Sequence, residues 1–148
     1  MTVSSSCVRK ALVSGDVAAA ADLLGRPYRL RGTVGVGAKR GAALGFPTAN
    51  LEKPLTLVPG DGVYAVRARL PDGSEWPAAA NVGANPTFGE QTRKVEAHLM
   101  GFTGDLYAQD LAIDFIARLR DTKAFAGVDD LVEQLRVDIQ AARKMVTP

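Results

Sequence analysis

Hydrophobic and polar positions alternate with a period of two through the middle of this chain. In YRLRGTV, Tyr28, Leu30 and Val34 share one face, whereas the arginines and the threonine share the other. Four later segments alternate in the same way, and a PDGS turn at 71–74 makes residues 63–83 a hairpin. The pattern predicts strands at residues 28–34, 63–70, 76–82, 94–100 and 111–119.

These strands, about five or six in number, follow one another without a long helix between them. Parallel strands need crossover connections of roughly a dozen residues or more, so βαβ units do not fit the chain. Short antiparallel strands in one domain must protect their edges, and closing the sheet removes those edges. The pattern therefore predicts a mainly β protein with a closed antiparallel barrel.

Helical spacing replaces the alternation at both ends of the chain. Residues 4–25 predict a helical lead-in, which SGD at 14–16 divides in two and which ends at Gly25. Because the apolar stripe of a helix pair needs cover, we expect this lead-in to pack on the barrel. A second stripe predicts a C-terminal helix with Gly127 as its N-cap, Asp129 and Asp130 in its first turn, and Arg143 and Lys144 in its last. That stripe consists of Val128, Leu131, Val132, Leu135 and Ile139.

Size and composition narrow the class of protein. A chain of 148 residues suits one domain, and a formal net charge of +2 gives no argument for nucleic acid or an anionic membrane as partner. Residues 1–40 hold seven Lys and Arg against two Asp, which favours either a solvated face or attraction of a small anion. With one cysteine and one histidine, neither an intrachain disulfide nor a Cys/His metal cluster can form. With no long apolar run, these features predict a cytoplasmic protein.

The stretch GVGAKRGAALGFPTAN, residues 35–50, offers the first candidate chemistry. Its glycines let backbone N–H groups approach phosphate oxygens, and Lys39 adds positive charge. Thr48 and Asn50 lie two residues apart, so in an extended backbone their side chains point the same way. A hydroxyl and an amide oxygen side by side suit Mg²⁺, which takes its other ligands from water and phosphates. From the residues alone, a glycine-rich turn with local hydrogen bonds remains the alternative.

Two further features carry polar groups. Glu96 lies on the strand face opposite Val95, and a carboxylate there could accept a proton from an attacking hydroxyl, or could be an exposed strand residue. His98, two residues later, is interpreted as structural. NVGANPTFG at 81–89 has the composition of a loop, and Asn81, Asn85 and Thr87 would place donors and acceptors in it, as a binding loop or a plain connection.

Several motifs in one order make the chain resemble the riboflavin kinase family, in the form found as the C-terminal module of bacterial bifunctional riboflavin kinase/FMN adenylyltransferase (FAD synthetase). The resemblance covers residues 26–145. It rests on RPYRLRGTVGVG, LGFPTANL, GVYAV, AAANVGANPTFG, VEAHLMGFTGDLYAQDL, FIARLRDTKAF and LVEQLRVDIQAAR. It implies a six-stranded antiparallel Greek-key barrel with a C-terminal helix, and transfer of the ATP γ-phosphoryl group to the 5′-hydroxyl of riboflavin, giving FMN and ADP.

The resemblance also implies roles for individual residues. Thr48 and Asn50 would bind Mg²⁺ or another divalent metal together with phosphate, and Glu96 would be the catalytic base. Arg120 and Phe125 would contact the flavin. The residues implied to bind the nucleotide are Gly35, Gly37, Lys39, Gly41, Gly45 and Pro47. Gly101 and Ala108 depart from the family pattern and affect only the expected turn geometry.

The lead-in adds an expectation about domain organisation. Residues 1–25 resemble the end of an adenylyltransferase module, so residues 26–148 would be the kinase domain. The rest of such a module would lie before this chain in a full-length protein, and this chain alone is not expected to make FAD. Two alternatives stay open here: a flavin-binding barrel without catalysis, and a regulatory module that needs its partner domain. ATP-dependent formation of FMN would separate the kinase from both.

Overall fold

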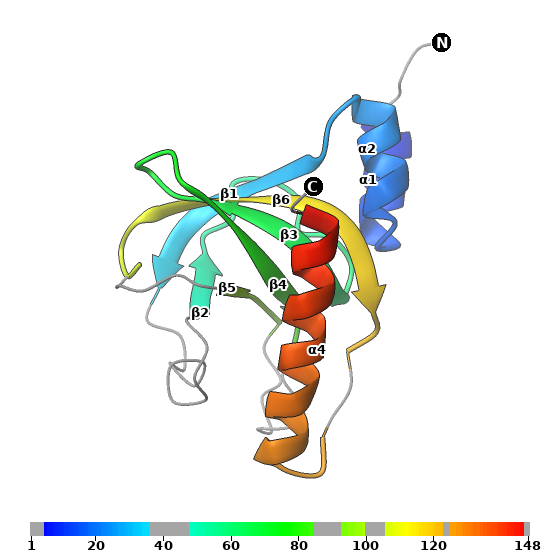
Figure 1. Ribbon diagram of the computed structural model, residues 1–148. Coiled ribbons are helices and arrows are strands. Elements are labelled where there is room, and N and C mark those ends of the chain that lie inside the picture. Colours follow the sequence, from blue (N-terminus) through cyan, green and yellow to red (C-terminus); the bar gives the residue numbers. More distant parts are fainter. Residues whose placement is uncertain (1–4, 36–47, 85–92, 100–105, 123–124, 147–148) are drawn as a thin grey trace.

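The structure is a computed structural model, and it describes residues 5–35, 48–84, 93–99, 106–122 and 125–146. Within these ranges two helices precede six strands, and one long helix follows them (Figure 1). The elements are α1 (Ser5–Val13), α2 (Val17–Leu24), β1 (Tyr28–Gly35), β2 (Thr48–Glu52), β3 (Gly62–Arg69), β4 (Glu75–Gly83), β5 (Lys94–Leu99), β6 (Asp110–Arg120) and α4 (Val128–Val146).

The six strands form a closed antiparallel barrel in the order β1-β2-β5-β4-β3-β6. The predicted hairpin at residues 63–83 is the β3–β4 pair, and β5 lies between β2 and β4 although it follows β4 in the chain. β1 pairs with both β2 and β6, which closes the sheet. The predicted closed antiparallel barrel and C-terminal helix are therefore confirmed.

The inside of the barrel is apolar. On β1 the buried Leu30 and Val34 alternate with more exposed neighbours, as the period of two predicted. Tyr64 and Phe115 meet edge to face with ring centroids 5.1 Å apart, which is a favourable aromatic geometry. Ala78 and Ala80 of β4 and Ala97 of β5 belong to the same buried cluster as these rings.

Helix α4 lies along the outside of the barrel and covers β3 and β4 (Figure 1). Ala65 on the outer face of β3 packs against Ala142 and Val146 of the helix. As a result the first five residues of β3 are all buried, and the alternation disappears there. Because the helix covers the outer face, β3 has two buried faces although it belongs to an antiparallel sheet.

Strand β6 departs from the predicted alternation in its second half. The sequence placed Ala117 and Leu119 on the face of Leu111, but the β3–β6 register shifts between Ala65 and Val66 and again between Val63 and Tyr64. A bulge adds a residue to one strand and changes the face of the residues that follow. Leu119 accordingly packs against the cluster under α4, together with Ile116, which alternation had already placed on that outer face.

The helical lead-in packs on the barrel. Leu12, Val17 and Ala20 are buried and belong to the same apolar core as Tyr64 and Phe115. The amide of Gly60 donates to the carbonyl of Leu12 at 2.8 Å, and a side chain at Gly60 would overlap the carbonyl oxygen of Val13. Glycine is thus required where the helix pair meets the segment before β3.

Candidate active site

The strand register brings predicted site residues from different strands into one line. Asn50 on β2 lies opposite Glu96 on β5, which in turn lies opposite Asn81 on β4. Directly opposite residues of antiparallel strands put their side chains on the same face. The neighbouring Ala49 and Ala97 belong to the core, so these three side chains lie on the outside of the barrel. We call Asn50, Glu96 and Asn81 the outer polar row.

Gly35 extends the line of the outer polar row onto β1, because it pairs with Asn50. A side chain at position 35 would overlap the carboxylate of Glu52, which folds over this glycine. The end of β1 therefore approaches β2 closely beside Asn50. The other predicted nucleotide-binding positions, Gly37, Lys39, Gly41, Gly45 and Pro47, lie outside the described residues, as do Asn85, Thr87 and Gly101.

Asn50 carries an unusual feature for a half-buried side chain. Its Oδ1 atom is buried and accepts no hydrogen bond, and it is the one such side-chain atom found across the described ranges. An unsatisfied buried acceptor destabilises a fold by about 1–3 kcal/mol. A buried oxygen of this kind calls for an explanation such as an ion or a ligand. A neutral hard oxygen fits Mg²⁺ well.

Thr48 lies two residues before Asn50 on β2, so both side chains are on the same outer face. It pairs with His98 of β5. Thr48 Oγ1 and His98 Nδ1 are 3.1 Å apart, a hydrogen-bond distance. Thr48, Asn50 and Glu96 are all half-buried. The register thus brings the two predicted metal ligands and the predicted base together on two neighbouring strands.

His98 is buried, with 8% of its surface exposed, although its alternation position predicts an outward residue. Burial lowers the pKa of its imidazole from 6.5 to about 4, and the negative charge of Asp138 opposes this shift only in part. The ring is therefore neutral near pH 7, with one nitrogen as donor and the other as acceptor. Its burial agrees with the structural role expected from the sequence.

Arg120 is the last residue of β6. Val63 of β3 pairs with Asn81 of β4 on one side and with Arg120 of β6 on the other. Its Nε and Nη2 atoms donate to the two carboxylate oxygens of Asp138, at 3.1 and 2.8 Å, and its Nη1 donates to the carbonyl of Asp121 at 2.9 Å. The guanidinium also lies over the ring of Phe125, 5.8 Å from its centroid. Arg120 thus joins β6 to α4 and to Phe125.

The sequence placed Asn81 both in the predicted strand at 76–82 and in a loop at 81–89, and the structure holds it in β4, which continues to Gly83. Asp138 escaped the sequence reasoning. Asp138 lies on the buried face of α4, where it is 3% exposed and accepts hydrogen bonds from Arg120 and Gln134. The available signal was spacing: Asp138 follows the buried Leu131 by seven residues, which puts it on the same face of the helix.

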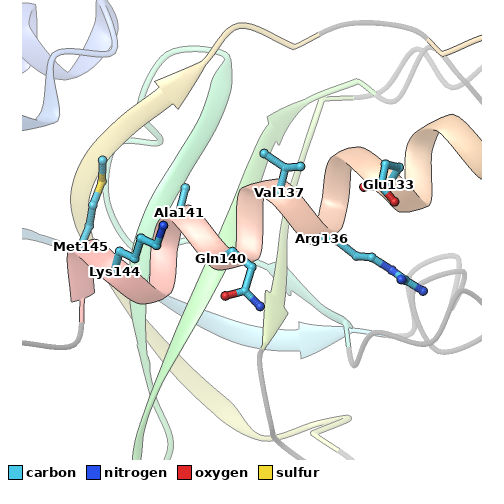
Figure 2. Close-up of a pocket in the computed structure, with 7 residues that line it drawn as sticks. All are labelled: Glu133, Arg136, Val137, Gln140, Ala141, Lys144 and Met145. Carbon is cyan, nitrogen blue, oxygen red and sulfur yellow. The ribbon is translucent and has the colours of Figure 1, made fainter.

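Two cavities bordered by described residues lie away from the outer polar row. One, of about 500 Å³, follows the exposed face of α4 between Glu133 and Met145 (Figure 2). The other, of about 680 Å³, lies between β1, β6 and the β3–β4 turn, with Arg31 and Lys53 in its lining. Among the described helices, none is long and apolar enough to cross a membrane.

Comparison with known proteins gives consistent matches. The riboflavin kinase (flavokinase) family model matches residues 24–146. A bifunctional riboflavin kinase/FMN adenylyltransferase from Pseudomonas fluorescens is 41% identical over 149 residues, which is 100% of this chain and 48% of that protein. A protein of the same name from Bacillus subtilis is 40% identical over 144 residues, which is 95% of this chain and 45% of that protein. The chain spans about half the length of the curated relatives it matches.

Solved structures show the same fold. A crystal structure described as a macrolide-efflux protein from Streptococcus pneumoniae aligns with a TM-score of 0.85 and 37% identity, covering 96% of this chain and 47% of that one. A riboflavin kinase from Trypanosoma brucei aligns with a TM-score of 0.55 and 25% identity, covering 81% of this chain and 77% of that one. The family match over residues 24–146 and the curated relatives together establish that this chain belongs to the riboflavin kinase family.

Proposed function

We propose that this chain transfers the γ-phosphoryl group of ATP to the 5′-hydroxyl of the ribityl chain of riboflavin, giving FMN and ADP. Membership of the riboflavin kinase family supports the reaction. The observation that carries the assignment of the site is the unsatisfied Oδ1 of Asn50, which lies opposite Glu96 in the β2–β5 register. In this proposal the oxygen of Asn50 holds the cation, and the carboxylate of Glu96 on the neighbouring strand accepts the proton.

We assign Thr48 and Asn50 as the residues that hold Mg²⁺ or another divalent metal with the ATP phosphates. Both supply neutral oxygens, and a site with two protein ligands leaves positions for phosphate and water, as Mg²⁺ prefers. When bound, the metal neutralises charge on the triphosphate. At Gly35 the carboxylate of Glu52 fills the space that a side chain would take, and the predicted glycine loop with Lys39 and Pro47 would supply the contacts to the nucleotide.

Glu96 is assigned as the general base. It is half-buried, and the strand register puts it between Asn50 and Asn81. The 5′-oxygen of riboflavin forms a bond to the γ-phosphorus, and the bond from that phosphorus to the β–γ bridging oxygen breaks. The hydroxyl proton passes to Glu96, and ADP leaves with the electron pair of the broken bond.

The flavin is assigned to the side of the site where β6 ends. Phe125 is half-buried, and the Arg120 guanidinium lies over its ring, which prepares a flat surface on which an aromatic ligand can stack. Because Asp138 and Asp121 accept most of the donors of Arg120, the contribution of this arginine to flavin binding is through the position of Phe125.

The whole protein is proposed to have a second activity. The matched relatives are named as bifunctional enzymes with FMN adenylyltransferase activity, and residues 1–25 resemble the end of that module. In this proposal residues 26–148 are the kinase domain, and residues 1–148 alone produce FMN and no FAD. An adenylyltransferase module would be the N-terminal partner of the kinase domain.

The test is to incubate the purified chain with riboflavin, ATP and Mg²⁺ and to separate flavins by chromatography. We expect FMN and ADP in equal amounts, and no FMN when either ATP or metal is omitted. Riboflavin binding without ADP formation under any divalent metal would contradict the kinase assignment and favour a non-catalytic flavin-binding barrel. Activity that appears only in a longer protein with its N-terminal module would favour a regulatory module.

A further inference from the structure

A cavity on the outside of the barrel carries positive charge that the proposed function does not use. It lies between β1, β6 and the β3–β4 turn, and its volume is about 680 Å³. Cavities of roughly 300–1,000 Å³ are typical of small-molecule sites. Arg31 of its lining precedes Gly35 on β1 by four residues, which is roughly 13 Å along a strand. We call it the β1–β6 cavity, and it is separate from the outer polar row.

The strand register places two arginines on either side of a small residue in this cavity. Ala112 of β6 pairs with Arg31 of β1 on one side and with Arg69 of β3 on the other. Ala112 alternates with the core residues Leu111 and Ile113, so the three paired side chains are on the outer face of the barrel. The two arginine positions are two strand spacings apart, roughly 10 Å, and both line the cavity beside the short side chain of the alanine.

The protein itself neutralises three cations of this cavity only weakly. Across the described ranges, neither Arg31 nor Lys53 forms an ion pair or a side-chain hydrogen bond. Arg69 Nε reaches the carboxylate of Glu75 only at 3.9 Å, and the same carboxylate oxygen is 3.5 Å from Arg67. Ion pairs this long and this exposed contribute little, so most of the positive charge remains available to a ligand.

Two carboxylates lie close to these three cations, and they differ in their effect. Asp114 accepts from Nε and Nη2 of Arg29 at 2.6 and 3.0 Å, a bidentate pair in which the two charges cancel. Asp110 is the acidic residue among the described lining residues, and it precedes Ala112 on β6 by two positions. One carboxylate against three cations leaves the lining with a positive balance.

The β1–β6 cavity also has apolar walls. Leu55 is 74% exposed although it is a large hydrophobic residue, and its amide donates to the carbonyl of Arg31 at 2.9 Å, which holds the segment after β2 against β1. Leu70 and Pro71, which follow β3, line the opposite side. Lys53 has a φ of 50°, a left-handed conformation that favours glycine, so keeping a lysine there costs stability. Apolar walls with a few charged groups are the usual form of a small-molecule site.

We propose that the β1–β6 cavity binds a phosphate monoester of mononucleotide size, with the phosphate group between Arg31 and Arg69. The apolar part of the ligand lies against Leu55 and Pro71. Arginine binds phosphate oxygens through pairs of hydrogen bonds, and Lys53 adds a point charge at the rim. The inference does not rest on the proposed function, because it uses no residue of the outer polar row and no metal.

The test is to titrate the isotope-labelled protein with AMP in the presence of a metal chelator and to follow its backbone amides by NMR. Inorganic phosphate and adenosine are titrated separately, because they carry only the anion and only the ring system. We expect saturable shifts at Arg31, Leu55 and Ala112, and a lower Kd for AMP than for either part. Higher ionic strength should weaken the binding of AMP and of phosphate, since screening reduces the attraction between exposed charges.

Variants assign the binding to this cavity. Arg31→Met and Arg69→Met each remove one charge, and each should raise the Kd of AMP about 3- to 10-fold, whereas Arg31→Lys should recover part of the loss. Asp110→Asn removes the opposing carboxylate and should lower the Kd about 2- to 5-fold, an effect that a loss of folding cannot imitate. Arg9→Met is the control for net charge, because Arg9 is exposed on α1 and is not in the lining, and it should leave the Kd unchanged.

Several results would overturn the proposal. If AMP shifts only the amides around Asn50 and Glu96, it binds at the candidate active site and not in this cavity. If the control variant weakens binding as much as Arg31→Met, the attraction is a general effect of net charge. If AMP binds no more tightly than phosphate or adenosine, the cavity does not select a monoester. Should a methionine variant fail to fold, the tightening expected for Asp110→Asn decides. A lack of FMN formation would not affect this test, because the titration contains neither metal nor riboflavin.

Discussion

Replacing Asn50 by leucine should stabilise the ligand-free protein and abolish its activity. The buried Oδ1 of Asn50 accepts no hydrogen bond, which costs the folded state about 1–3 kcal/mol. Leucine has the same number of side-chain heavy atoms, branched in the same way, and no polar atom, so Asn50→Leu removes this cost. After allowing for other contacts of the amide, we expect a gain of about 1 kcal/mol in the free energy of unfolding. For a domain of this size that gain raises Tm by roughly 2–4 °C.

The assay is thermal unfolding of the ligand-free variant, followed by the same measurement with Mg·ADP. Asn81→Leu is the matched control, because Asn81 lies on the same outer face two strands away and no buried atom of it lacks a partner. Subtracting its effect removes the general preference of strands for leucine over asparagine. We expect a higher Tm for Asn50→Leu than for Asn81→Leu, and no further rise with Mg·ADP.

Two results would refute this reasoning. If Asn50→Leu is less stable than the wild-type protein, or no more stable than Asn81→Leu, then Oδ1 is satisfied in solution and is not an open ligand position. If the variant keeps the full Mg·ADP-induced rise in Tm, Asn50 does not hold the metal–nucleotide.

Three further predictions concern the base, the buried histidine and the ion pair under α4. Glu96→Gln should lower kcat by roughly 100-fold or more in the FMN assay without changing Tm by more than a few degrees, and unchanged turnover would remove Glu96 as the base. Because the pKa of His98 is lowered from 6.5 to about 4, the unfolded chain binds the proton more readily, so stability is complete above pH 6.5 and falls as the pH drops toward 4. At about 1.4 kcal/mol per pH unit the total loss is about 3 kcal/mol, and urea unfolding of His98→Asn should lack this loss relative to wild type; parallel curves would contradict the buried neutral ring. Arg120→Met leaves Asp138 buried without its cation and should cost about 3–5 kcal/mol in urea unfolding, whereas the double variant Arg120→Met/Asp138→Leu should recover most of it; no recovery would contradict a cost that comes from the unpaired charge.

Most of the barrel was predictable because its strands bury one face each. Leu30 and Val34 on β1, or Val95 and Ala97 on β5, alternate with outward residues, and this alternation is a local property of the sequence. The predictions were wrong where tertiary contacts changed which faces are buried. Alternation gave no signal that α4 covers the outside of β3, and a bulge in β6 moved Leu119 to the side of α4.

For the candidate site, too, the sequence indicated some residues and only the fold showed which of them are neighbours. The resemblance to riboflavin kinases pointed to Thr48, Asn50 and Glu96, but apart from the hairpin at residues 63–83 the sequence pattern did not say which strand lies beside which. Only the barrel order puts β5 between β2 and β4, although β4 precedes it in the chain. That order puts Asn81 beside Glu96 and His98 beside Thr48, neither of which follows from spacing along the chain.

The sequence by itself therefore determined the strand pattern, the terminal helices and the residue types that can hold a cation and accept a proton, since these depend on local periodicity and side-chain chemistry. The tertiary structure decided which of those residues meet and how much solvent each one retains. The buried oxygen of Asn50 and the neutral ring of His98 both result from burial by segments distant in the chain, because desolvation is a property of the whole fold.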